Sequence, residues 1–313
     1  MPDLSVVVVS FNSIDWLRAC LQSVYARAGG CKLEVIVVDS DSSDGSPDLV
    51  EREFPRARVL RRANRGFAAA NNAGLAAASA EFVLFLNPDT EILDGTFRDL
   101  LVLLAARPSV GMVGCRQLSA NGSLIPTIRR FPSASRYLFE ALGSERLSID
   151  FPWLGERVRN PDVYEHETTC DWTSGSFMLA RRELLIAVGG MDERYFLYCE
   201  EPDLCLRIKD LGWEVRHLPA MTILHYGGGI NERLIAQDAY ARRQYMLKNM
   251  SPGRRRTATL AFALGHALRG AYPVRDPSLR RVRRSSAIRA ILLVLGLGAP
   301  PFGPSSTSSQ QTC

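Results

Sequence analysis

The 313-residue sequence lacks the marks of several protein classes. It holds seven cysteines, an odd number, and no two are spaced as Cys-x-x-Cys, so neither a zinc ribbon nor a disulfide framework is predicted. A reduced, cytoplasmic setting fits this cysteine usage. The longest apolar run, Ala290 to Pro300, is about half of the ~20 residues that a membrane-spanning helix needs. The N-terminal residues do not show a basic segment followed by a long apolar stretch, so no signal peptide is predicted.

Acidic residues are scarce in the C-terminal part of the chain. Residues 251–313 contain ten arginines and one acid, Asp276, whereas the first 250 residues carry a slight excess of acids. A basic tail on a mildly acidic body predicts a polyanionic partner. Aromatic residues are few among these arginines, which argues against nucleic acid. Aliphatic residues alternate with them over 251–292, which predicts contact with an anionic membrane surface, the alternative being a solvated tail.

Strand and helix signals alternate through the first 90 residues, and the apolar content of 46% suits an ordinary globular core. This alternation predicts an α/β fold with a mostly parallel sheet. Strands are predicted over residues 4–9, 33–38, 59–60, 82–86, 111–115, 175–180 and 214–217. Helices are predicted over 14–28, from 48, and over 71–78, 93–106, 181–188 and 232–250. The loop-rich segment 119–168 is predicted to be an insertion on the substrate side.

A strand that stops at a carboxylate is the most informative segment. Five apolar residues, Phe82 to Leu86, precede Asn87, Pro88 and Asp89. The run is too short for a stable helix and suits a strand buried on both faces, which Pro88 ends. Open α/β sheets bind ligands at the carboxyl ends of their strands. Asp89 is therefore predicted to hold a divalent metal and, through it, a diphosphate.

Polar residues also follow the earlier strands. Asp39 ends a strand and precedes a serine-rich turn that includes Ser42, where a nucleotide base or ribose would find hydrogen bonds. The alternative is an ordinary helix cap and turn. Arg65, followed by Gly66, is placed to reach a phosphate, the alternative being a surface arginine.

Three carboxylates within four residues, Glu200, Glu201 and Asp203, are the strongest signal in the second half. Their apolar flanks argue against a simple solvated run and favour a metal or proton-transfer site. Trp172, shortly before Gly175, is able to stack on a sugar, but a core tryptophan fits equally well. His225 stands beside a glycine run as a candidate metal ligand, the alternative being a structural histidine.

Taken in order, these segments resemble the family 2 inverting glycosyltransferases with the GT-A fold, and within them the bacterial rhamnosyltransferase-like subgroup that builds surface polysaccharide or cell-wall linkers. The matching stretches, within roughly residues 4–230, are VVVVSFN at 6–12, VVDSDSSDGS at 37–46, NRGF at 64–67, NPD at 87–89, DW at 171–172 with Gly175, GGMDE at 189–193, YCEEPDLCLR at 198–207, and His225.

The resemblance implies a GT-A domain over 1–250, a Rossmann-like twisted sheet flanked by helices. Its nucleotide-sugar half would cover 1–115 and its acceptor half 116–250. Residues 251–313 would form a basic, partly helical tail with a disordered end.

The resemblance also implies roles for individual positions. Glu201 would be the catalytic base, at a position where the family usually has the Asp of a Glu-Asp pair, with Glu200 and Asp203 as alternatives. Asp89 matches the last Asp of the family's D-x-D motif and would bind Mg²⁺ or Mn²⁺ together with His225. The nucleotide would be held by Ser10, Phe11, Asn12, Asp39, Ser42, Arg65 and Asn87. The acceptor or sugar would meet Trp172, Gly175, Asp192 and Glu193.

The implied activity is inverting transfer of a rhamnose-like hexose from a dTDP- or UDP-linked donor to a glycan or lipid-linked acceptor, at the inner face of the cell membrane. An oligomer is left open. One alternative is a nucleotide-sugar-binding protein without activity, since Asn87 and Glu201 depart from the family pattern. A sugar nucleotidyltransferase is the other alternative, but it would need a glycine-rich phosphate loop where Ser10 to Ser13 stand.

Overall fold

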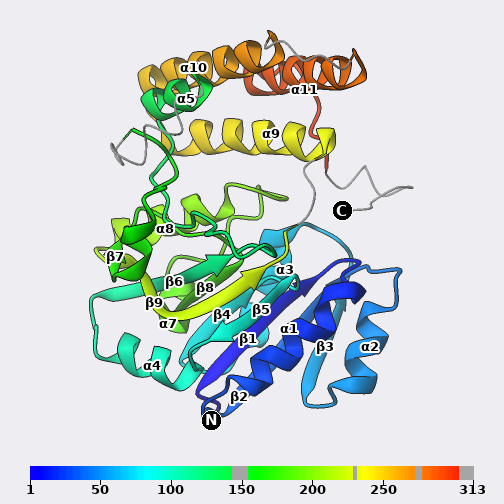
Figure 1. Ribbon diagram of the computed structural model, residues 1–313, viewed down its shortest axis with the longest axis vertical. Helices are drawn as coiled ribbons and strands as arrows, with labels where there is room; N and C mark the ends of the chain where they lie inside the picture. Colours follow the sequence, from blue (N-terminus) through cyan, green and yellow to red (C-terminus); the bar gives the residue numbers. More distant parts are fainter. Residues whose placement is uncertain (143–153, 228–230, 272–276, 303–313) are drawn as a thin grey trace.

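The structure is a computed structural model that describes residues 1–142, 154–227, 231–271 and 277–302. A mixed β-sheet lies at its centre (Figure 1). The strands are β1 (Leu4–Ser10), β2 (Leu33–Ser40), β3 (Ala57–Arg62), β4 (Phe82–Leu86), β5 (Thr90–Asp94), β6 (Val110–Leu118), β7 (Thr168–Thr169), β8 (Phe177–Arg181) and β9 (Glu214–His225). Their order is β3-β2-β1-β4-β8-β6-β9-β5, with β7 paired to β9.

Helices lie on both faces of this sheet and beyond one end of it. They are α1 (Ile14–Ala26), α2 (Ser46–Glu53), α3 (Phe67–Ala77), α4 (Phe97–Ala105), α5 (Ala134–Ala141), α7 (Arg182–Ala187), α8 (Glu200–Asp210), α9 (Glu232–Asn249), α10 (Pro252–Ala271) and α11 (Pro277–Leu295), with a 3-10 turn, η2 (Pro161–Glu165). One core joins the sheet to α1 and α4 through Leu17 and Phe97. A second core on the opposite face includes Ala68 of α3 and Leu204 of α8. The α/β class expected from the sequence is confirmed.

The register of the strands brings several loops to one edge of the sheet. β1 pairs in parallel with β2 and β4, whereas β4 pairs antiparallel with β8 so that Leu86 faces Phe177. The carboxyl ends of β1, β2 and β4 therefore meet the amino end of β8. Val6 to Val9 and Phe82 to Leu86 are buried on both sides of the sheet, which explains their continuous apolar sequence.

The segment around residues 90–106 differs from the prediction. Thr90–Asp94 forms the edge strand β5, paired antiparallel with β9, and the helix begins only at Phe97. Thr96 caps that helix, because its hydroxyl accepts a 3.2 Å hydrogen bond from the amide of Asp99. Leu93, which the predicted helix 93–106 would have included, lies in β5 and is 40% exposed. β9 also continues to His225, well past the predicted end at 217.

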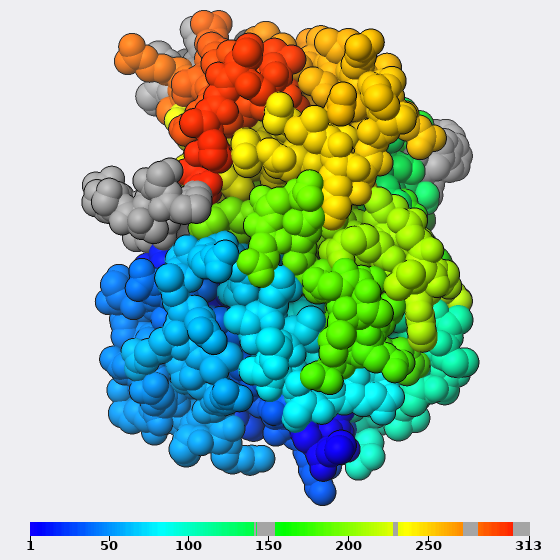
Figure 2. Space-filling view, turned by 180° about the vertical axis from the view of Figure 1, so that it is seen from behind, coloured from blue at the N-terminus to red at the C-terminus, as the bar shows by residue number. Residues whose placement is uncertain are grey.

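Helices α10 and α11 belong to a helical unit with α5 and α9. The unit lies at one end of the molecule, beyond the sheet, and its yellow-to-red segments are also seen together from behind (Figures 1 and 2). Tyr137, Ala239, Phe262 and Leu293, one from each helix, share its apolar core. The boundary expected at residue 250 stays a prediction. The end of the 251–313 tail was expected to be disordered, and its last residues, 303–313, lie outside the described residues. Within the described part of the chain, the helices do not combine the length and hydropathy that crossing a bilayer requires.

Candidate active site at the carboxyl edge of the sheet

The loops that follow β1 and β2 are tied together by short polar side chains. The amide of Asn12 donates to the Ser42 hydroxyl at 2.9 Å, and the amide of Ser43 donates to Oδ1 of Asn12 at 2.8 Å. The hydroxyls of Ser10 and Ser13 are 2.7 Å apart and buried. Such side-chain bonds to the backbone replace the bonds of a helix or strand. They hold the loop after β1 against the loop after β2, next to the half-buried Phe11.

Two buried oxygens at this edge lack a hydrogen-bond donor among the described residues. Asp39 is 2% exposed, and its Oδ2 accepts from the amide of Ser42 at 3.1 Å while its Oδ1 has no partner. The side-chain oxygen of Asn87 is the second such atom. Leaving a buried acceptor unpaired costs about 1–3 kcal/mol. The N–H and O–H groups of a nucleoside are donors of the kind that would satisfy both oxygens.

Asp89 and His225 lie side by side. Oδ2 of Asp89 and Nε2 of His225 are 3.4 Å apart, and the two side chains are 20% and 18% exposed. The pairing of β5 with β9 places Thr90 opposite His225 and so fixes this approach. The described residues contain no group of three or more His, Cys, Asp or Glu that could hold a metal. A carboxylate and an imidazole nonetheless suit a cation whose other ligands are water and phosphate oxygens, as is usual for Mg²⁺.

Glu201 reaches the same edge through Gly175. The amide of Gly175 donates to Oε1 of Glu201 at 3.1 Å, and a Cβ atom on Gly175 would lie only 2.8 Å from that oxygen. The next residue, Ser176, accepts a 3.1 Å hydrogen bond from the amide of Asn87 through its carbonyl. The segment before β8 thus connects Glu201 with the segment that carries Asp89.

Burial shifts the acid–base behaviour of the two glutamates. Desolvation raises the pKa of Glu201, against the effects of hydrogen bonds from backbone amides and of the positive charge of Arg129. Glu200 is 2% exposed, its Oε2 has no described partner, and desolvation together with the charge of Glu201 raises its pKa well above the ordinary value. A carboxylate with a raised pKa is a better general base at neutral pH. Glu201 is half-buried, so of the two it is the more accessible.

The turn before α8 is built from two left-handed residues. Tyr198 and Cys199 have φ angles of 71° and 68°, although neither is glycine. Such residues cost roughly 1–2 kcal/mol each and are held only by their surroundings. The turn places Glu200, Glu201 and Asp203 in the first turn of the helix, where the helix dipole favours negative charge.

The Asp203 carboxylate is enclosed by hydrogen-bond donors. It is fully buried, and its oxygens accept from Nε of Arg207 at 2.9 Å, Nζ of Lys248 at 2.8 Å and Nδ2 of Asn249 at 3.0 Å. The hydroxyl of Tyr195 is a further donor at 3.3 Å. Since two cations and an amide occupy this carboxylate, no oxygen is left to accept a proton from a substrate. The geometry therefore argues against Asp203 as the alternative base.

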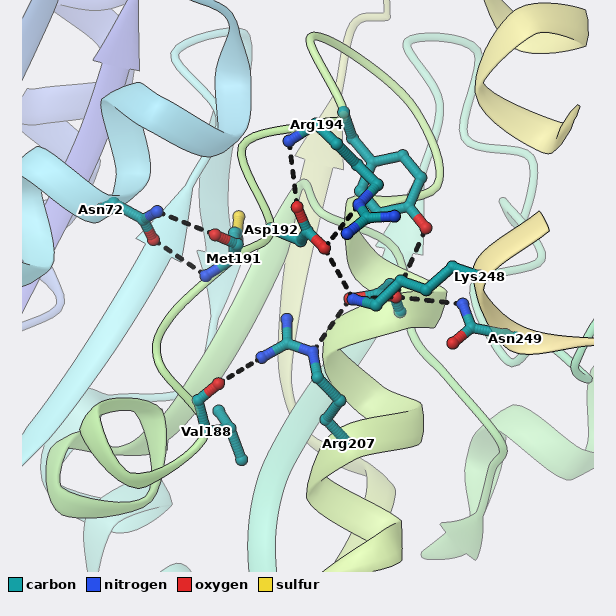
Figure 3. Close-up of polar contacts among 10 residues, drawn as sticks. Asn72, Val188, Met191, Asp192, Arg194, Arg207, Lys248 and Asn249 are labelled. Carbon is teal, nitrogen blue, oxygen red and sulfur yellow. Dashed lines mark hydrogen bonds and ion pairs between the residues drawn. The ribbon is translucent and has the colours of Figure 1, made fainter. Parts of the chain in front are cut away.

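The turn at 191–193 is held between α3 and α9. Asp192 accepts from Lys248 at 2.7 Å and from Nε of Arg194 at 2.8 Å (Figure 3). Although burial opposes it, the bond from Lys248 contributes to a lowered pKa of Asp192. Glu193 accepts from Asn72 at 3.1 Å and lies 3.7 Å from the 77% exposed Arg65. These contacts bring Arg65 to the 191–193 turn.

Trp172 is buried, as expected for a core tryptophan, which was the alternative to a residue that stacks on a sugar. It is 8% exposed, and its indole N–H donates to the carbonyl of Arg130 at 2.9 Å. The guanidinium of Arg129 lies 5.1 Å from the ring centroid. A ring so enclosed presents little surface to an acceptor, which favours the core alternative, and the sugar contact stays a prediction.

Two basic residues near the carboxylates were not found from the sequence. Burial lowers the pKa of Arg129 to about 10, and the charge of Glu201 is among the effects that oppose this. Lys248 bonds both Asp192 and Asp203. Neither residue stands in a motif, and Lys248 lies within a helix 45 residues beyond Asp203. Only the tertiary structure reveals them.

Comparison with known proteins places this geometry among sugar-transferring enzymes. Residues 5–185 match the family described as Glycosyl transferase family 2. The N-acetylglucosaminyl-diphospho-decaprenol L-rhamnosyltransferase of Mycobacterium tuberculosis is 31% identical over 235 residues, covering 71% of this chain and 76% of that protein. Rhamnosyltransferase WbbL of Escherichia coli is 26% identical over 229 residues, covering 71% and 82%.

The fold is shared with solved structures at lower identity. A mannosyltransferase from Pyrobaculum calidifontis, in complex with GDP-Man and Mn²⁺, superposes with a TM-score of 0.57 at 19% identity, covering 95% of this chain and 86% of that one. Residues 1–349 of TarS from S. aureus give a TM-score of 0.51 at 16% identity, with coverages of 93% and 89%.

Proposed function

The chain belongs to glycosyltransferase family 2, and from this premise we propose that it moves a rhamnose-like hexose from a nucleoside-diphosphate sugar to a hydroxyl of a glycan or lipid-linked acceptor. Two rhamnosyltransferases match 71% of its length, and the name of one of them specifies a diphospho-decaprenol acceptor. The product would serve cell-surface polysaccharide synthesis. The donor nucleotide would be thymidine or uridine diphosphate.

We assign the base to Glu201. Its raised pKa and its fixed Oε1 suit it to take the proton from an acceptor hydroxyl. The acceptor oxygen then forms a bond to the anomeric carbon as the bond to the diphosphate oxygen breaks, and the nucleoside diphosphate leaves. Attack from the face opposite the leaving group inverts the anomeric configuration, and an enzyme nucleophile is not required.

The donor would lie across the loops after β1, β2 and β4. Asp39 and Asn87 would accept hydrogen bonds from the nucleoside through the two oxygens that lack described partners. Ser10, Phe11, Asn12 and Ser42 would shape the same surface, and Arg65 would lie near the phosphates. Asp89 and His225 would hold Mg²⁺ or Mn²⁺, which when bound offsets the charge of the leaving diphosphate. Gly175, Asp192 and Glu193 would border the acceptor side.

The observation that carries this proposal is the pair of backbone contacts through which Gly175 and Ser176 bring Glu201 and the 87–89 segment to one edge of the sheet. The test is incubation of the protein with dTDP- and UDP-linked sugars, Mn²⁺ and a lipid-linked acceptor, followed by NMR of the product. We expect the anomeric configuration to be opposite to that of the donor. A retained configuration would refute the mechanism, and donor binding without turnover would favour the non-catalytic alternative.

We also propose that helices α10 and α11 contact an anionic membrane on the cytoplasmic side. Both helices combine exposed aliphatic and basic side chains, among them Leu260, Leu264, Leu268, Val282, Ile288, Leu292, Arg254, Arg256, Arg281, Arg284 and Arg289. Such surfaces bind anionic lipid through apolar burial and charge together. Vesicle flotation tests this: we expect the protein to float with vesicles that contain phosphatidylglycerol and to remain behind with pure phosphatidylcholine.

A further inference from the structure

A cavity of about 450 Å³ opens within the helical unit, and none of the site residues discussed above lines it. Its walls come from α9, α10 and α11, whose yellow, orange and red segments gather at one end of the space-filling view (Figure 2). The lining residues are Arg243, Met246, Leu247, Arg255, Arg256, Thr259, Leu260, Val294 and Leu295. Three arginines and five aliphatic or thioether side chains thus share one hollow, and the described residues that line it include no acid and no aromatic ring.

The three guanidinium groups of this cavity carry no counter-charge within the described residues. The structure shows no ion pair for Arg243, Arg255 or Arg256 among those residues. The neighbouring Arg242 contrasts with them, because it bonds Asp238 and Glu156. Three like charges that face one hollow repel one another, so an anion bound among them would be stabilised.

Arg243 is held in place by the end of α11. A Cβ atom on Gly296 would lie 2.7 Å from Nη2 of Arg243 and 3.0 Å from its Cζ, so the guanidinium rests directly on that glycine. A packed guanidinium loses less freedom when it binds a ligand than a freely rotating one does. The cavity therefore has one positioned cation, with Arg255 half-buried and Arg256 exposed beside it.

We propose that this cavity binds the head group of an anionic phospholipid, an inference that rests on the proposed membrane contact of α10 and α11. Guanidinium forks match the oxygens of a phosphate. The beginning of the acyl chains would lie on Leu247, Leu260 and Leu295, which are 39%, 66% and 46% exposed and so lead out of the cavity to the surface. A volume near 450 Å³ suits a head group and the first carbons of its chains.

The lining argues against other anions. A nucleotide would need an aromatic or amide surface for its base, and a sugar would need acceptors for its hydroxyls. Among the described residues that line the cavity, Thr259 is the one side chain that could accept such a bond. Free phosphate would make no use of the aliphatic wall, which forms more than half of the lining side chains. An amphiphile with a negative head is the ligand class that uses both halves of the cavity.

The test uses a lipid that is soluble as a monomer, so that a general attraction to a charged surface plays no part. Dihexanoyl-phosphatidylglycerol below its micelle concentration is titrated into the full-length protein in a calorimeter. The variant that removes the cavity charges is Arg243→Gln/Arg255→Gln/Arg256→Gln. Its matched control, Arg58→Gln/Arg62→Gln/Arg98→Gln, removes the same charge from exposed positions outside the cavity and outside the helices proposed to contact the membrane.

We expect the unaltered protein and the control to bind with affinities within about twofold, and the cavity variant to bind about tenfold more weakly for each arginine removed. The exposed single variant Arg256→Gln, which should fold normally, should lose about tenfold by itself. Equal binding by cavity variant and control would overturn the proposal. So would equal binding of dihexanoyl-phosphatidylcholine, or binding of inorganic phosphate as tight as that of the lipid.

Failure of this inference can be told from failure of the proposed function. Vesicle flotation and sugar transfer by the unaltered protein report on membrane contact and on activity, whereas the monomeric lipid reports on the cavity alone. A protein that transfers sugar and floats with anionic vesicles but ignores the monomeric lipid would retain its function and lose only the cavity assignment.

Discussion

The backbone amide of Gly175 donates a 3.1 Å hydrogen bond to Oε1 of Glu201, and the missing side chain of the glycine is what permits the approach. This contact fixes one oxygen of the carboxylate and leaves the other to meet a substrate. The relationship joins two residues that the sequence placed in different roles, one beside the acceptor and one as the base. The first two predictions rest on it.

Replacement of the proposed base should stop transfer without loss of donor binding. Glu201→Gln keeps the shape and the acceptor for the Gly175 amide but cannot take a proton, so we expect the rate to fall by about 10²- to 10⁴-fold. Nucleotide affinity, measured by calorimetry, should change little. A variant that turns over at the normal rate would disprove the assignment of the base.

A methyl group at Gly175 should displace the carboxylate. The Cβ atom of Gly175→Ala would lie 2.8 Å from Oε1 and 3.1 Å from Cγ of Glu201, so the glutamate must move. We expect a lower kcat while nucleotide affinity is maintained. The control is Gly253→Ala, at a position where a Cβ meets nothing within 4 Å. If both variants transfer sugar equally well, the contact does not position the base.

The buried Glu200 should make stability depend on pH. Desolvation and the charge of Glu201 raise the pKa of Glu200 above the ordinary 4.5, so the folded chain binds this proton more tightly than the unfolded chain does. Its contribution is then full below the unfolded pKa and is lost as the pH rises. In denaturant titrations from about pH 5 to about pH 8, Glu200→Gln should lose less stability than the unaltered protein. An exposed control, Glu183→Gln, should behave like the unaltered protein.

Removal of the Asp203 carboxylate should lower the free energy of unfolding of the protein, and not only its activity. Asp203→Ala would leave Arg207 and Lys248 without a carboxylate that both now contact, and breaking such a buried pair costs about 3–5 kcal/mol. Urea denaturation should show this loss, and Asp210→Ala, exposed at the end of the same helix, should not. Normal stability with abolished transfer would instead restore Asp203 as a candidate for the chemistry.

Loss of the Asp89 carboxylate should abolish the dependence of donor affinity on the metal ion. Asp89→Asn removes the charged member of the Asp89–His225 pair, so we expect nucleoside diphosphate to bind in Mn²⁺ about as weakly as it binds to the unaltered protein in EDTA. The control is Asp94→Asn, an exposed carboxylate at the end of β5, the strand that begins just after Asp89. Metal-dependent binding that survives in Asp89→Asn would place the cation elsewhere.

The buried parallel strands were predictable because their sequence has few alternatives. Val6 to Val9 and Phe82 to Leu86 are apolar on both faces, which a surface helix does not tolerate. The edge strand β5 was missed because it spans only five residues, its last two residues are both exposed, and its partner, β9, lies far along the chain. Local pattern does not disclose such a pairing.

The sequence predicted the site residues that directly follow strands. It did not predict the contacts that other site residues make with distant segments of the chain. Asp39 and Asp89 stand at strand ends, so the sheet edge that gathers them follows from topology. The role of Asp203 depends on Lys248 and Asn249, and the enclosure of Trp172 depends on Arg129 and Arg130. These partners become neighbours only when the chain packs, so the sequence left the alternatives open.

The packing of α9 determines where this chain can be shortened. Ala239 and Met246 of α9 are buried because α10 and α11 pack against them. Lys248, at the end of the same helix, donates a hydrogen bond to Asp203. Truncation after residue 250, at the boundary that composition suggests, would expose the apolar face of α9, the helix that carries Lys248, to solvent. The truncated protein would aggregate, so a loss of its activity would not be evidence that α10 and α11 bind lipid.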